Sequence, residues 1–385
     1  MLCLCICNFT NNIYLVNMMN KSSNIFCIKQ FAFIPPPYGG VSTYVKRLIL
    51  RLNQLGITTG GYYLSDCTDS IIQDSNLFHK WKWMPTHLFL FRIIQYAFET
   101  RKYKIVHSHF SLEGMLYLWF LRTFCNKKII ITVHNAMVND YLAKTNFLNR
   151  FFLKKMSQFQ DVTWIAVSPQ VKSSLLDLNL EFASDIHVIP AYIPPIKKQN
   201  SELPISLQRY IDSYSKVMVF YGHSLMQYSG NDVYGFDIVL RLYASLSADE
   251  RCNIGLVYCI ATCSEGEFAS ILAKAKSMGV DKSIFWQVGA LDDMTSLWEQ
   301  ADVYVRPTYT DGDSVAVREA LDMGVQVVAS NVCQRPEKVI TYKYGNDCML
   351  LESLRYAISK GREKQSCDET YLNQMVEIYK NILAR

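Results

Sequence analysis

The sequence lacks the patterns that mark several specialised classes of protein. No uninterrupted apolar run reaches the roughly 18 residues of a membrane-spanning helix, and no internal repeat of about 20–50 residues is present. Only 19% of the residues are charged, and the net charge of +5 is too small to indicate a dedicated nucleic-acid-binding protein. The mild positive charge is compatible with an anionic substrate or an anionic membrane surface.

Metal-binding cysteine pairs are also missing. The 12 cysteines stand mostly singly in apolar segments, as Cys27 and Cys259 do, and no C-x-x-C pair occurs. Neither a zinc site nor a disulfide framework is therefore indicated. Free thiols in a reducing cytosol are the simplest interpretation, so we expect a cytoplasmic protein.

The first 18 residues do not form a typical signal peptide. They are apolar, but Asn8, Asn11 and Asn12 interrupt them, and no basic residues precede them. Met19, a second candidate start, stands shortly before a strand-like run at 25–31. We expect residues 1–18 to be a non-structural leader.

The length of the chain predicts two domains, because a single core rarely grows beyond roughly 250–300 residues. Short runs of strand-forming residues alternate with helix-sized segments, which predicts parallel sheets with crossover helices and ligands bound at the carboxyl ends of the strands. A stretch rich in proline and serine interrupts this alternation at 191–215. The expected divisions are a Rossmann-like domain at 19–195, a linker at 196–215, a second Rossmann-like domain at 216–365 and a C-terminal helix at 366–385 that packs back on the first domain.

The segment V-R-P-T-Y-T-D-G-D-S-V-A-V-R-E-A-L, residues 305–321, carries the strongest functional signal. A strand is predicted to end at Pro307, and a helix is predicted to begin near Ser314. The N-terminus of a helix presents free N–H groups and a partial positive charge, which can bind phosphate. Asp311 in the turn would face the group that follows the phosphate, and Glu319 inside the helix could accept hydrogen bonds from a ribose. A helix N-terminus with an incidental Asp and Glu is the alternative.

This segment resembles the E-x7-E motif of glycosyltransferase family 4, P-S-x-x-E-G-F-G-x-x-x-x-E-A. Asp311 stands where the family has Glu and is one methylene shorter, and Ser314 replaces the second Gly of the motif. Asp311-Gly312-Asp313 also matches the D-x-D pattern of metal-dependent transferases, but that pattern is only three residues long and lies near the middle of a domain in another fold. The residues in register with the family motif are Pro307, Thr308, Asp311, Gly312, Ser314, Glu319 and Ala320.

Two segments of the first half extend the resemblance. The loop at 35–40 ends in Gly39-Gly40, like the Gly-Gly loop of the family, and two glycines let the backbone approach a ligand closely. A plain strand-to-helix turn is the alternative, and the absence of G-x-G-x-x-G gives no support for nicotinamide binding. The family has a histidine at the place of His134 that contacts the donor sugar. His109 and Asn135 are candidates on the acceptor side, with a satisfied core or loop histidine as the alternative for both histidines.

The resemblance is weakest where the family carries Arg and Lys in a G-R-x-x-x-x-K-G stretch that offsets the charge of the donor's diphosphate. Gly222 matches, but His223 and Tyr234 stand near the Arg and Lys positions. Arg306 and Arg318, which flank the main motif, are the candidate replacements. A further departure precedes Pro336-Glu337, where the chain reads Cys-Gln-Arg.

The resemblance implies the GT-B fold, an α/β architecture of two Rossmann-like doubly wound domains that face each other across a cleft, the first for the acceptor and the second for the donor. It implies transfer of a sugar from a UDP- or GDP-linked donor with retention of configuration, without a cofactor or an obligatory metal. The acceptor would be a glycan or a polyprenyl-linked glycan of cell-envelope or capsule polysaccharide synthesis. The implied catalytic residues are His134, Asp311 and Glu319; the implied donor- and phosphate-binding residues are Gly39, Gly40, Gly222, Arg306, Gly312, Ser314, Val315 and Arg318.

Aromatic and basic residues alternate in two helix-sized segments, 81–103 and 147–159. They resemble interfacial helices on an anionic membrane, which would place the protein on the cytoplasmic face of the inner membrane. Ordinary amphipathic core helices are the alternative. For the whole chain, a nucleotide-sugar 2-epimerase of the same fold and a catalytically silent sugar-nucleotide-binding protein remain the competing functions.

Overall fold

The computed structural model describes residues 27–34, 39–63, 72, 76–80, 89–109, 114–135, 138–195, 202–291 and 294–384. The expected leader at 1–18 and the first residues of the expected linker, 196–201, lie outside the described residues. Within them no helix is both long enough and apolar enough to span a membrane.

A seven-stranded sheet, in the order β3-β2-β1-β4-β5-β6-β7, forms the centre of the first domain. All of its paired neighbours run parallel, and the strands at 105–108, 128–133 and 162–166 are largely buried, as expected for a parallel sheet covered by helices on both faces. The strands are β1 (Cys27–Ile34), β2 (Thr58–Tyr63), β3 (Phe78–Lys80), β4 (Ile105–Ser108), β5 (Lys128–Val133), β6 (Val162–Ala166) and β7 (Ile186–Val188). The helices are α2 (Gly40–Gln54), α4 (Phe89–Thr100), α5 (Met115–Cys125), α6 (Val138–Lys144), α7 (Phe147–Ser157) and α8 (Pro169–Leu176).

A six-stranded parallel sheet, in the order β12-β11-β8-β13-β14-β15, forms the second domain. Its strands are β8 (Lys216–Gly222), β11 (Ile254–Ile260), β12 (Ile284–Val288), β13 (Val303–Arg306), β14 (Gln326–Ser330) and β15 (Ile340–Tyr342), with a small antiparallel hairpin of β9 (Gln227–Tyr228) and β10 (Asn231–Asp232). Its helices are α9 (Ile205–Asp212), α10 (Phe236–Ala244), α11 (Ala248–Asn253), α12 (Glu265–Ser277), α13 (Thr295–Trp298), α14 (Val315–Asp322) and α15 (Asp347–Lys360).

Helix α9 corrects part of the expected linker. Of the three strong apolar residues in 205–212, Ile205 is exposed and only Leu207 and Ile211 are one helical turn apart, so the periodicity is weak in the sequence. Both side chains are nevertheless buried in the core of the second domain. The expectation of a linker is therefore wrong for these residues, because two apolar residues spaced by one helical turn are enough to hold a short helix on an existing sheet.

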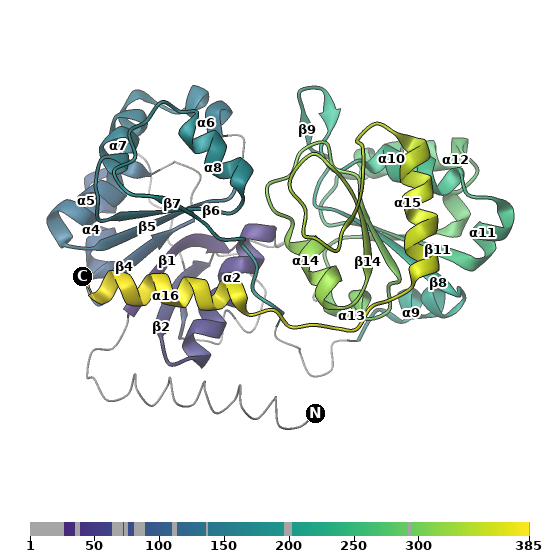
Figure 1. Ribbon diagram of the computed structural model, residues 1–385, viewed down its shortest axis with the longest axis horizontal. Coiled ribbons are helices and arrows are strands. Elements are labelled where there is room, and N and C mark those ends of the chain that lie inside the picture. The colour runs from purple at the N-terminus through teal and green to yellow at the C-terminus, as the bar shows by residue number, and fades with distance from the viewer. Residues whose placement is uncertain are drawn as a thin grey trace.

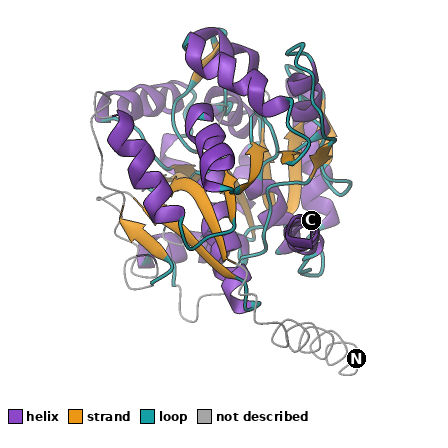
Figure 2. Cartoon of the chain, turned by 90° about the vertical axis from the view of Figure 1, so that its left-hand side faces the viewer, coloured by secondary structure: helices purple, strands orange, loops and turns teal. Residues whose placement is uncertain are grey.

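The last helix, α16 (Thr370–Ala384), lies against the first domain rather than the second. After α15 the chain crosses back between the domains, and α16 runs along the first sheet beside α2 (Figure 1, yellow). Its apolar face, Leu372, Met375, Tyr379 and Ile382, is buried in the core cluster of the first domain. The view at right angles places α16 beside the same sheet (Figure 2).

The two domains meet at the carboxyl edges of their sheets. In each sheet the order of the strands reverses next to one strand, β1 in the first domain and β8 in the second, which is where open parallel sheets bind ligands. Across this junction the Tyr192 hydroxyl donates a hydrogen bond to Asp322 at 2.5 Å, and Tyr228 donates one to Asp140 at 2.5 Å. The junction is thus a set of specific contacts around a cleft.

Candidate active site

The turn between β13 and α14 is fixed by local chemistry. Ser314 caps α14, because its hydroxyl accepts a hydrogen bond from the N–H of Val317 at 3.4 Å. Gly235, which precedes α10, lies against the start of the same turn at a φ of 78°, and a Cβ there would be only 2.5 Å from the carbonyl oxygen of Pro307. Only glycine fits this position, so the loop before α10 packs directly under the turn that carries Asp311.

A cavity of about 260 Å³ lies between the domains at this turn. One wall is the N-terminus of α14 with the turn before it, and the opposite wall comes from the start of α2 and the end of β5. The sequence-predicted residues that line it are Gly39, Gly40, His134 and Asn135 of the first domain and Arg306, Asp311, Gly312, Ser314 and Val315 of the second.

Two of the predicted glycines allow the walls to approach each other. A Cβ on Gly312 would lie 2.8 Å from the backbone oxygen of His134, and one on Gly40 would lie 3.5 Å from the Val315 side chain. Gly222 has a different role, because a Cβ there would collide with the ring of Phe236 within the second domain. The structure therefore explains Gly222 by packing and does not bring it into the cavity.

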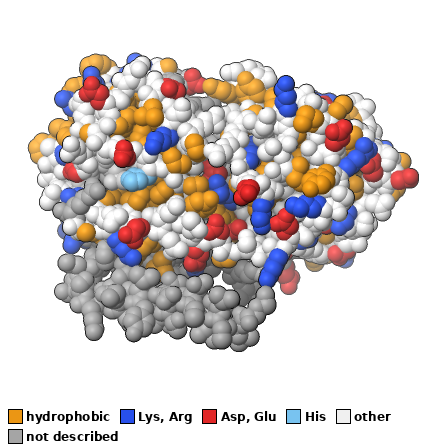
Figure 3. All heavy atoms as spheres, viewed as in Figure 1, with side chains coloured by type: hydrophobic (Ala, Val, Ile, Leu, Met, Phe, Trp, Pro, Cys, Tyr) orange, Lys and Arg blue, Asp and Glu red, His pale blue; other side chains and the backbone are white. Residues whose placement is uncertain are grey.

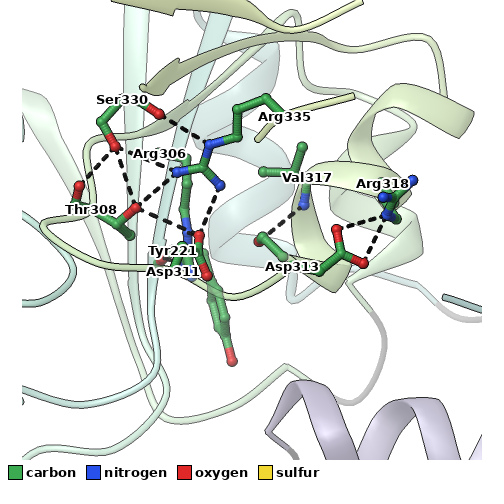
Figure 4. A network of polar contacts seen from close by, with 10 residues as sticks. Tyr221, Arg306, Thr308, Asp311, Asp313, Val317, Arg318, Ser330 and Arg335 are labelled. Atoms are coloured by element: carbon green, nitrogen blue, oxygen red, sulfur yellow. Dashed lines mark hydrogen bonds and ion pairs between the residues drawn. The ribbon is translucent and has the colours of Figure 1, made fainter. Parts of the chain in front are cut away.

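Asp311 is held by two arginines (Figure 4). Arg306 at the end of β13 donates to it at 3.1 Å, and Arg335 from the loop after β14 donates to it at 2.9 Å. Arg335 also donates to Thr308 Oγ1 and to the Ser330 carbonyl oxygen, both at 3.0 Å. Burial alone would raise the pKa of Asp311, but the charges of the two arginines outweigh it and lower this pKa to about 2.

The cluster of Arg306, Arg335 and Asp311 carries one excess positive charge. Of the two arginines, Arg306 lines the cavity, and its guanidinium lies 5.0 Å from the centre of the Tyr234 ring. Tyr234 stands near the position where the resemblance predicts a lysine, so the structure has an arginine stacked on the residue that replaces the expected cation. His223, at the other expected cation position, also lines the cavity, and burial lowers its pKa.

Glu319 is buried in an ion pair between the domains. The Arg47 guanidinium of α2 lies 2.6 Å from one carboxylate oxygen, and the indole N–H of Trp298 donates to the other at 3.1 Å. The Glu319 side chain is 7% exposed. Its carboxylate therefore already has two donors in this structure, one of them charged.

Arg318 does not reach the cavity. Its guanidinium donates to Asp313 at 2.9 Å and to the Tyr371 hydroxyl at 3.0 Å, on the other side of the start of α14 (Figure 4). Burial raises the pKa of Asp313, and the Arg318 charge offsets this only in part. The sequence predicted the same role at the diphosphate for Arg306 and Arg318, because both flank the motif. Of these two, the structure brings only Arg306 to the cavity.

Of the two histidines of the first domain that the sequence singles out, His134 lines the cavity and His109 does not. His109 lies behind it and is 6% exposed, with Nδ1 placed 3.1 Å from His134 Nε2 and Nε2 placed 2.7 Å from Gln30 Oε1. Both ring nitrogens of His109 are thus engaged inside the domain and the structure does not bring this residue into the cavity, so a role on the acceptor side stays a prediction. Burial lowers the pKa of His134 to about 4, so that it is neutral at pH 7.

Comparisons with known sequences identify the two halves. The sequence model described as "Glycosyltransferase Family 4" matches residues 38–195, and the one described as "Glycosyl transferases group 1" matches residues 226–354. The chain belongs to glycosyltransferase family 4. Neither match favours the 2-epimerase or the silent binding protein.

A curated relative within this enzyme class is the D-inositol 3-phosphate glycosyltransferase of Corynebacterium diphtheriae. It is 23% identical over 282 residues, which are 68% of this chain and 63% of the relative. The chain thus spans less than two thirds of the length of that relative.

Solved structures show that the fold is GT-B. The glycosyltransferase from Rickettsia africae ESF-5 superposes with a TM-score of 0.66 at 16% identity, covering 94% of this chain and 99% of that one. HepE of Anabaena in complex with UDP and glucose gives a TM-score of 0.67 at 10% identity, covering 93% and 100%. Sucrose-phosphate synthase from Thermosynechococcus elongatus superposes with a TM-score of 0.63 at 15% identity. The match covers 93% of this chain and 99% of that one.

Two charged residues near the cavity were not predicted from the sequence. Arg335 stands in the Cys-Gln-Arg departure before Pro336-Glu337, so the sequence did contain a signal for it. Arg47 occupies an ordinary position in an amphipathic helix, and nothing local distinguishes it from Lys46 or Arg51. Only the apposition of the domains shows that it faces Glu319.

Proposed function

We propose that this protein transfers a sugar from a nucleoside-diphosphate sugar to a glycan or lipid-linked glycan acceptor, with retention of the anomeric configuration. The observation that carries the proposal is the cavity between the domains, in which Asp311 and the N-terminus of α14 face His134 and the Gly39-Gly40 turn. Such a cavity can hold a sugar and a diphosphate between a carboxylate and a set of backbone N–H groups.

The donor would lie with its diphosphate at the start of α14. The N–H groups at Ser314 and Val315 and the guanidinium of Arg306 would bind the phosphates, and Asp311 would accept hydrogen bonds from the sugar. Among the structural neighbours, HepE of Anabaena has been solved with UDP-glucose and with UDP, which supports a nucleotide-sugar as the donor of this chain as well. Glu319 would bind the ribose after exchanging Arg47 for hydroxyl donors.

Transfer would proceed on one face of the sugar. The bond from the anomeric carbon to the diphosphate breaks, the acceptor oxygen forms a bond to the same face, and the acceptor proton passes to the departing phosphate. The site supplies electrostatic stabilisation of the leaving group, for which Arg306 and the helix N-terminus are placed. His134 is neutral, so it would contact the sugar as a hydrogen-bonding group rather than as a cation.

We also propose that the first domain binds an anionic membrane and that the acceptor is a lipid-linked glycan of envelope or capsule polysaccharide synthesis. Helices α4, α5 and α7 present solvent-exposed apolar side chains, and basic residues accompany them. Figure 3 shows hydrophobic side chains at the surface of the half that contains the first domain. The protein would then work at the cytoplasmic face of the inner membrane. The exposed apolar side chains of these helices are Phe91, Ile94, Phe98, Phe124, Phe147, Leu148 and Phe151.

Part of the interfacial segment packs inward instead. Ile93 is buried at 8% exposure, so α4 is amphipathic, with one face in the core and the other in solvent. Trp81 and Trp83, which belong to the same sequence segment, lie outside the described residues. The membrane proposal therefore rests on the outer faces of α4, α5 and α7.

A panel of UDP- and GDP-sugars tests the main proposal. The full chain is incubated with each donor, and release of nucleoside diphosphate is measured with and without extracted lipid-linked acceptors. We expect slow release without acceptor and faster release with it, and the same rates in EDTA, because no obligatory metal is proposed. Conversion of the sugar without release would support an epimerase, and neither outcome with any donor would support a binding protein.

A matched pair of variants ties the activity to the cavity. Asp311→Asn removes the carboxylate that faces the donor sugar, and we expect it to abolish most of the release. Asp347→Asn changes an exposed aspartate of α15 that pairs with Arg241 on the surface, and we expect it to leave the rate unchanged. Equal rates in the two variants would place the reaction elsewhere.

A further inference from the structure

Six polar side chains form one continuous hydrogen-bonded chain inside the first domain. It starts on β5, passes through the C-terminal helix α16 and ends at His134 in the wall of the cavity. Tyr379, which α16 contributes, is 1% exposed, and Gln30 on β1 is fully buried. The links are Thr132 Oγ1 to His107 Nε2 (2.7 Å), His107 Nδ1 to the Tyr379 hydroxyl (2.7 Å), the Tyr379 hydroxyl to Gln30 Nε2 (3.1 Å), Gln30 Oε1 to His109 Nε2 (2.7 Å) and His109 Nδ1 to His134 Nε2 (3.1 Å).

Burial forces this chain to have a direction. Burial lowers the pKa of His107 to about 3 and that of His134 to about 4, so the imidazoles are neutral at pH 7. A neutral imidazole has one N–H donor and one acceptor nitrogen. His107 and His109, which are 0% and 6% exposed, must therefore each accept from one neighbour and donate to the other, so that one orientation determines the next.

Gln30 sets the direction. Its amide NH₂ donates to the Tyr379 hydroxyl and its oxygen faces His109, so the hydrogen of His109 is on Nε2. Nδ1 of His109 is then an acceptor, and the hydrogen that it accepts is on Nε2 of His134. On the other side Tyr379 accepts from Gln30 and donates to Nδ1 of His107, whose Nε2–H donates to Thr132. The same direction thus holds over the whole chain.

We propose that Gln30 and Tyr379 are positioning residues that hold His134 in its Nε2-protonated tautomer. This leaves Nδ1 of His134 as a hydrogen-bond acceptor, suited to a sugar hydroxyl. The tautomer follows from these hydrogen bonds between neutral imidazoles, whereas its use toward the donor sugar rests on the proposed function. Through Tyr379, the last helix of the chain acts on His134 by way of Gln30 and His109.

Nitrogen NMR of the full chain with ¹⁵N-labelled histidine tests the tautomer without any activity measurement. We expect His134, assigned by the signals that disappear in His134→Gln, to show one protonated nitrogen at Nε2 and one unprotonated nitrogen at Nδ1 at pH 7. Protonation at Nδ1, or an even mixture of tautomers in the unmodified protein, overturns the proposal.

Two variants test which residues impose the tautomer. Tyr379→Phe removes the hydroxyl that accepts from the Gln30 amide, so that this amide can rotate. Gln30→Met removes both the donor to Tyr379 and the acceptor for His109. In each we expect the His134 signals to shift toward a mixture of tautomers. Tyr342→Phe is the matched control, because Tyr342 is 1% exposed and its hydroxyl has no hydrogen-bond partner among the described residues. Unchanged His134 signals in both Tyr379→Phe and Gln30→Met would overturn the assignment.

Kinetics then separate positioning from folding. We expect Tyr379→Phe to lower kcat about tenfold, the effect of one hydrogen bond in the transition state, with little change in KM for the donor. Tyr342→Phe should keep both constants. A loss of tautomer with unchanged kcat would overturn the use of His134 in transfer. An unmodified protein that transfers no sugar would refute the proposed function and leave the tautomer measurement valid.

Discussion

The guanidinium of Arg47 on α2 lies 2.6 Å from the carboxylate of Glu319 on α14, so an ion pair with little exposure joins the two domains. The resemblance to the family implies that the Glu319 carboxylate binds the ribose of the donor. Here a charged partner from the opposite domain occupies it. If Glu319 binds the ribose as proposed, donor binding and the contact between α2 and α14 compete for the same carboxylate.

This competition predicts how the two partners respond to mutation. Arg47→Met leaves Glu319 buried without its cation, and we expect a loss of about 3 kcal/mol in the free energy of unfolding. Arg47→Met combined with Glu319→Gln should recover most of this loss, since no unpaired charge remains. Urea unfolding followed by tryptophan fluorescence measures both.

The control is Lys338→Met, which removes the cation of an exposed pair with Glu363. A change of no more than about 0.5 kcal/mol is expected there. If Arg47→Met were as mild as this control, the pair between α2 and α14 would not form in solution.

The second prediction concerns Arg335, the residue that anchors Asp311. Arg335→Met removes donors to Asp311, Thr308 and Ser330 at once, so Asp311 keeps only Arg306 to orient it. We expect kcat/KM for the donor to fall about 10- to 100-fold, the range of a lost charged hydrogen bond. Arg241→Met, which removes a surface arginine paired with Asp347, should leave kcat/KM unchanged. Equal values for the two variants would show that Asp311 needs no second arginine.

The sequence predicted the fold and the main motif because both depend on local patterns. Alternating apolar runs, the capped start of α14 and the residues from Pro307 to Ala320 can all be recognised from neighbours in the chain. The partners of the charges could not be predicted in this way. Arg47 and Glu319 come from different domains, and which arginine reaches Asp311 depends on how the loop after β14 folds over β13. The sequence likewise gave Arg306 and Arg318 the same role, although α14 directs Arg318 to Asp313 and Tyr371.

The third prediction is a loss of stability in mild acid. Unfolded histidines take up a proton near pH 6.5, whereas burial lowers the pKa of His134 to about 4 and that of His107 to about 3 in the folded protein. Between the folded and the unfolded pKa values the unfolded state binds more protons than the folded state. The contribution of these histidines to the free energy of unfolding is therefore fully present above pH 6.5 and is lost as the pH is lowered. Each of these histidines contributes a slope of about 1.4 kcal/mol per pH unit.

Urea unfolding at pH 7.0, 6.0 and 5.0 measures the slope. His107→Gln should reduce this pH dependence of the free energy of unfolding by the contribution of one histidine. His187→Gln, at an exposed position of β7, should not change it. A slope that is the same in all three proteins would mean that His107 is not held neutral by the fold.

The fourth prediction addresses the membrane surface. A triple variant, Phe91→Ser, Ile94→Ser and Phe98→Ser, removes three side chains of α4 that are 60%, 63% and 62% exposed. We expect the unmodified protein to float with vesicles that contain anionic lipid at low salt, and the triple variant to float at least several-fold less. Because these side chains face solvent, the variant should unfold at the same urea concentration as the unmodified protein.

Ile205→Ser is the control for this surface. Ile205 is 72% exposed on α9 of the second domain, so its loss should not affect flotation. No flotation of the unmodified protein at low salt would argue for a soluble acceptor, and equal flotation of the triple variant would move the contact to another surface.

The return of α16 to the first domain also has a consequence for synthesis. Leu372, Met375 and Ile382 fill the core beside the first sheet, yet the ribosome makes them after the whole second domain. The first domain therefore leaves the ribosome with a strip of apolar core uncovered, and it is completed last although it is made first. We expect the nascent chain to need a chaperone over this strip until translation reaches α16.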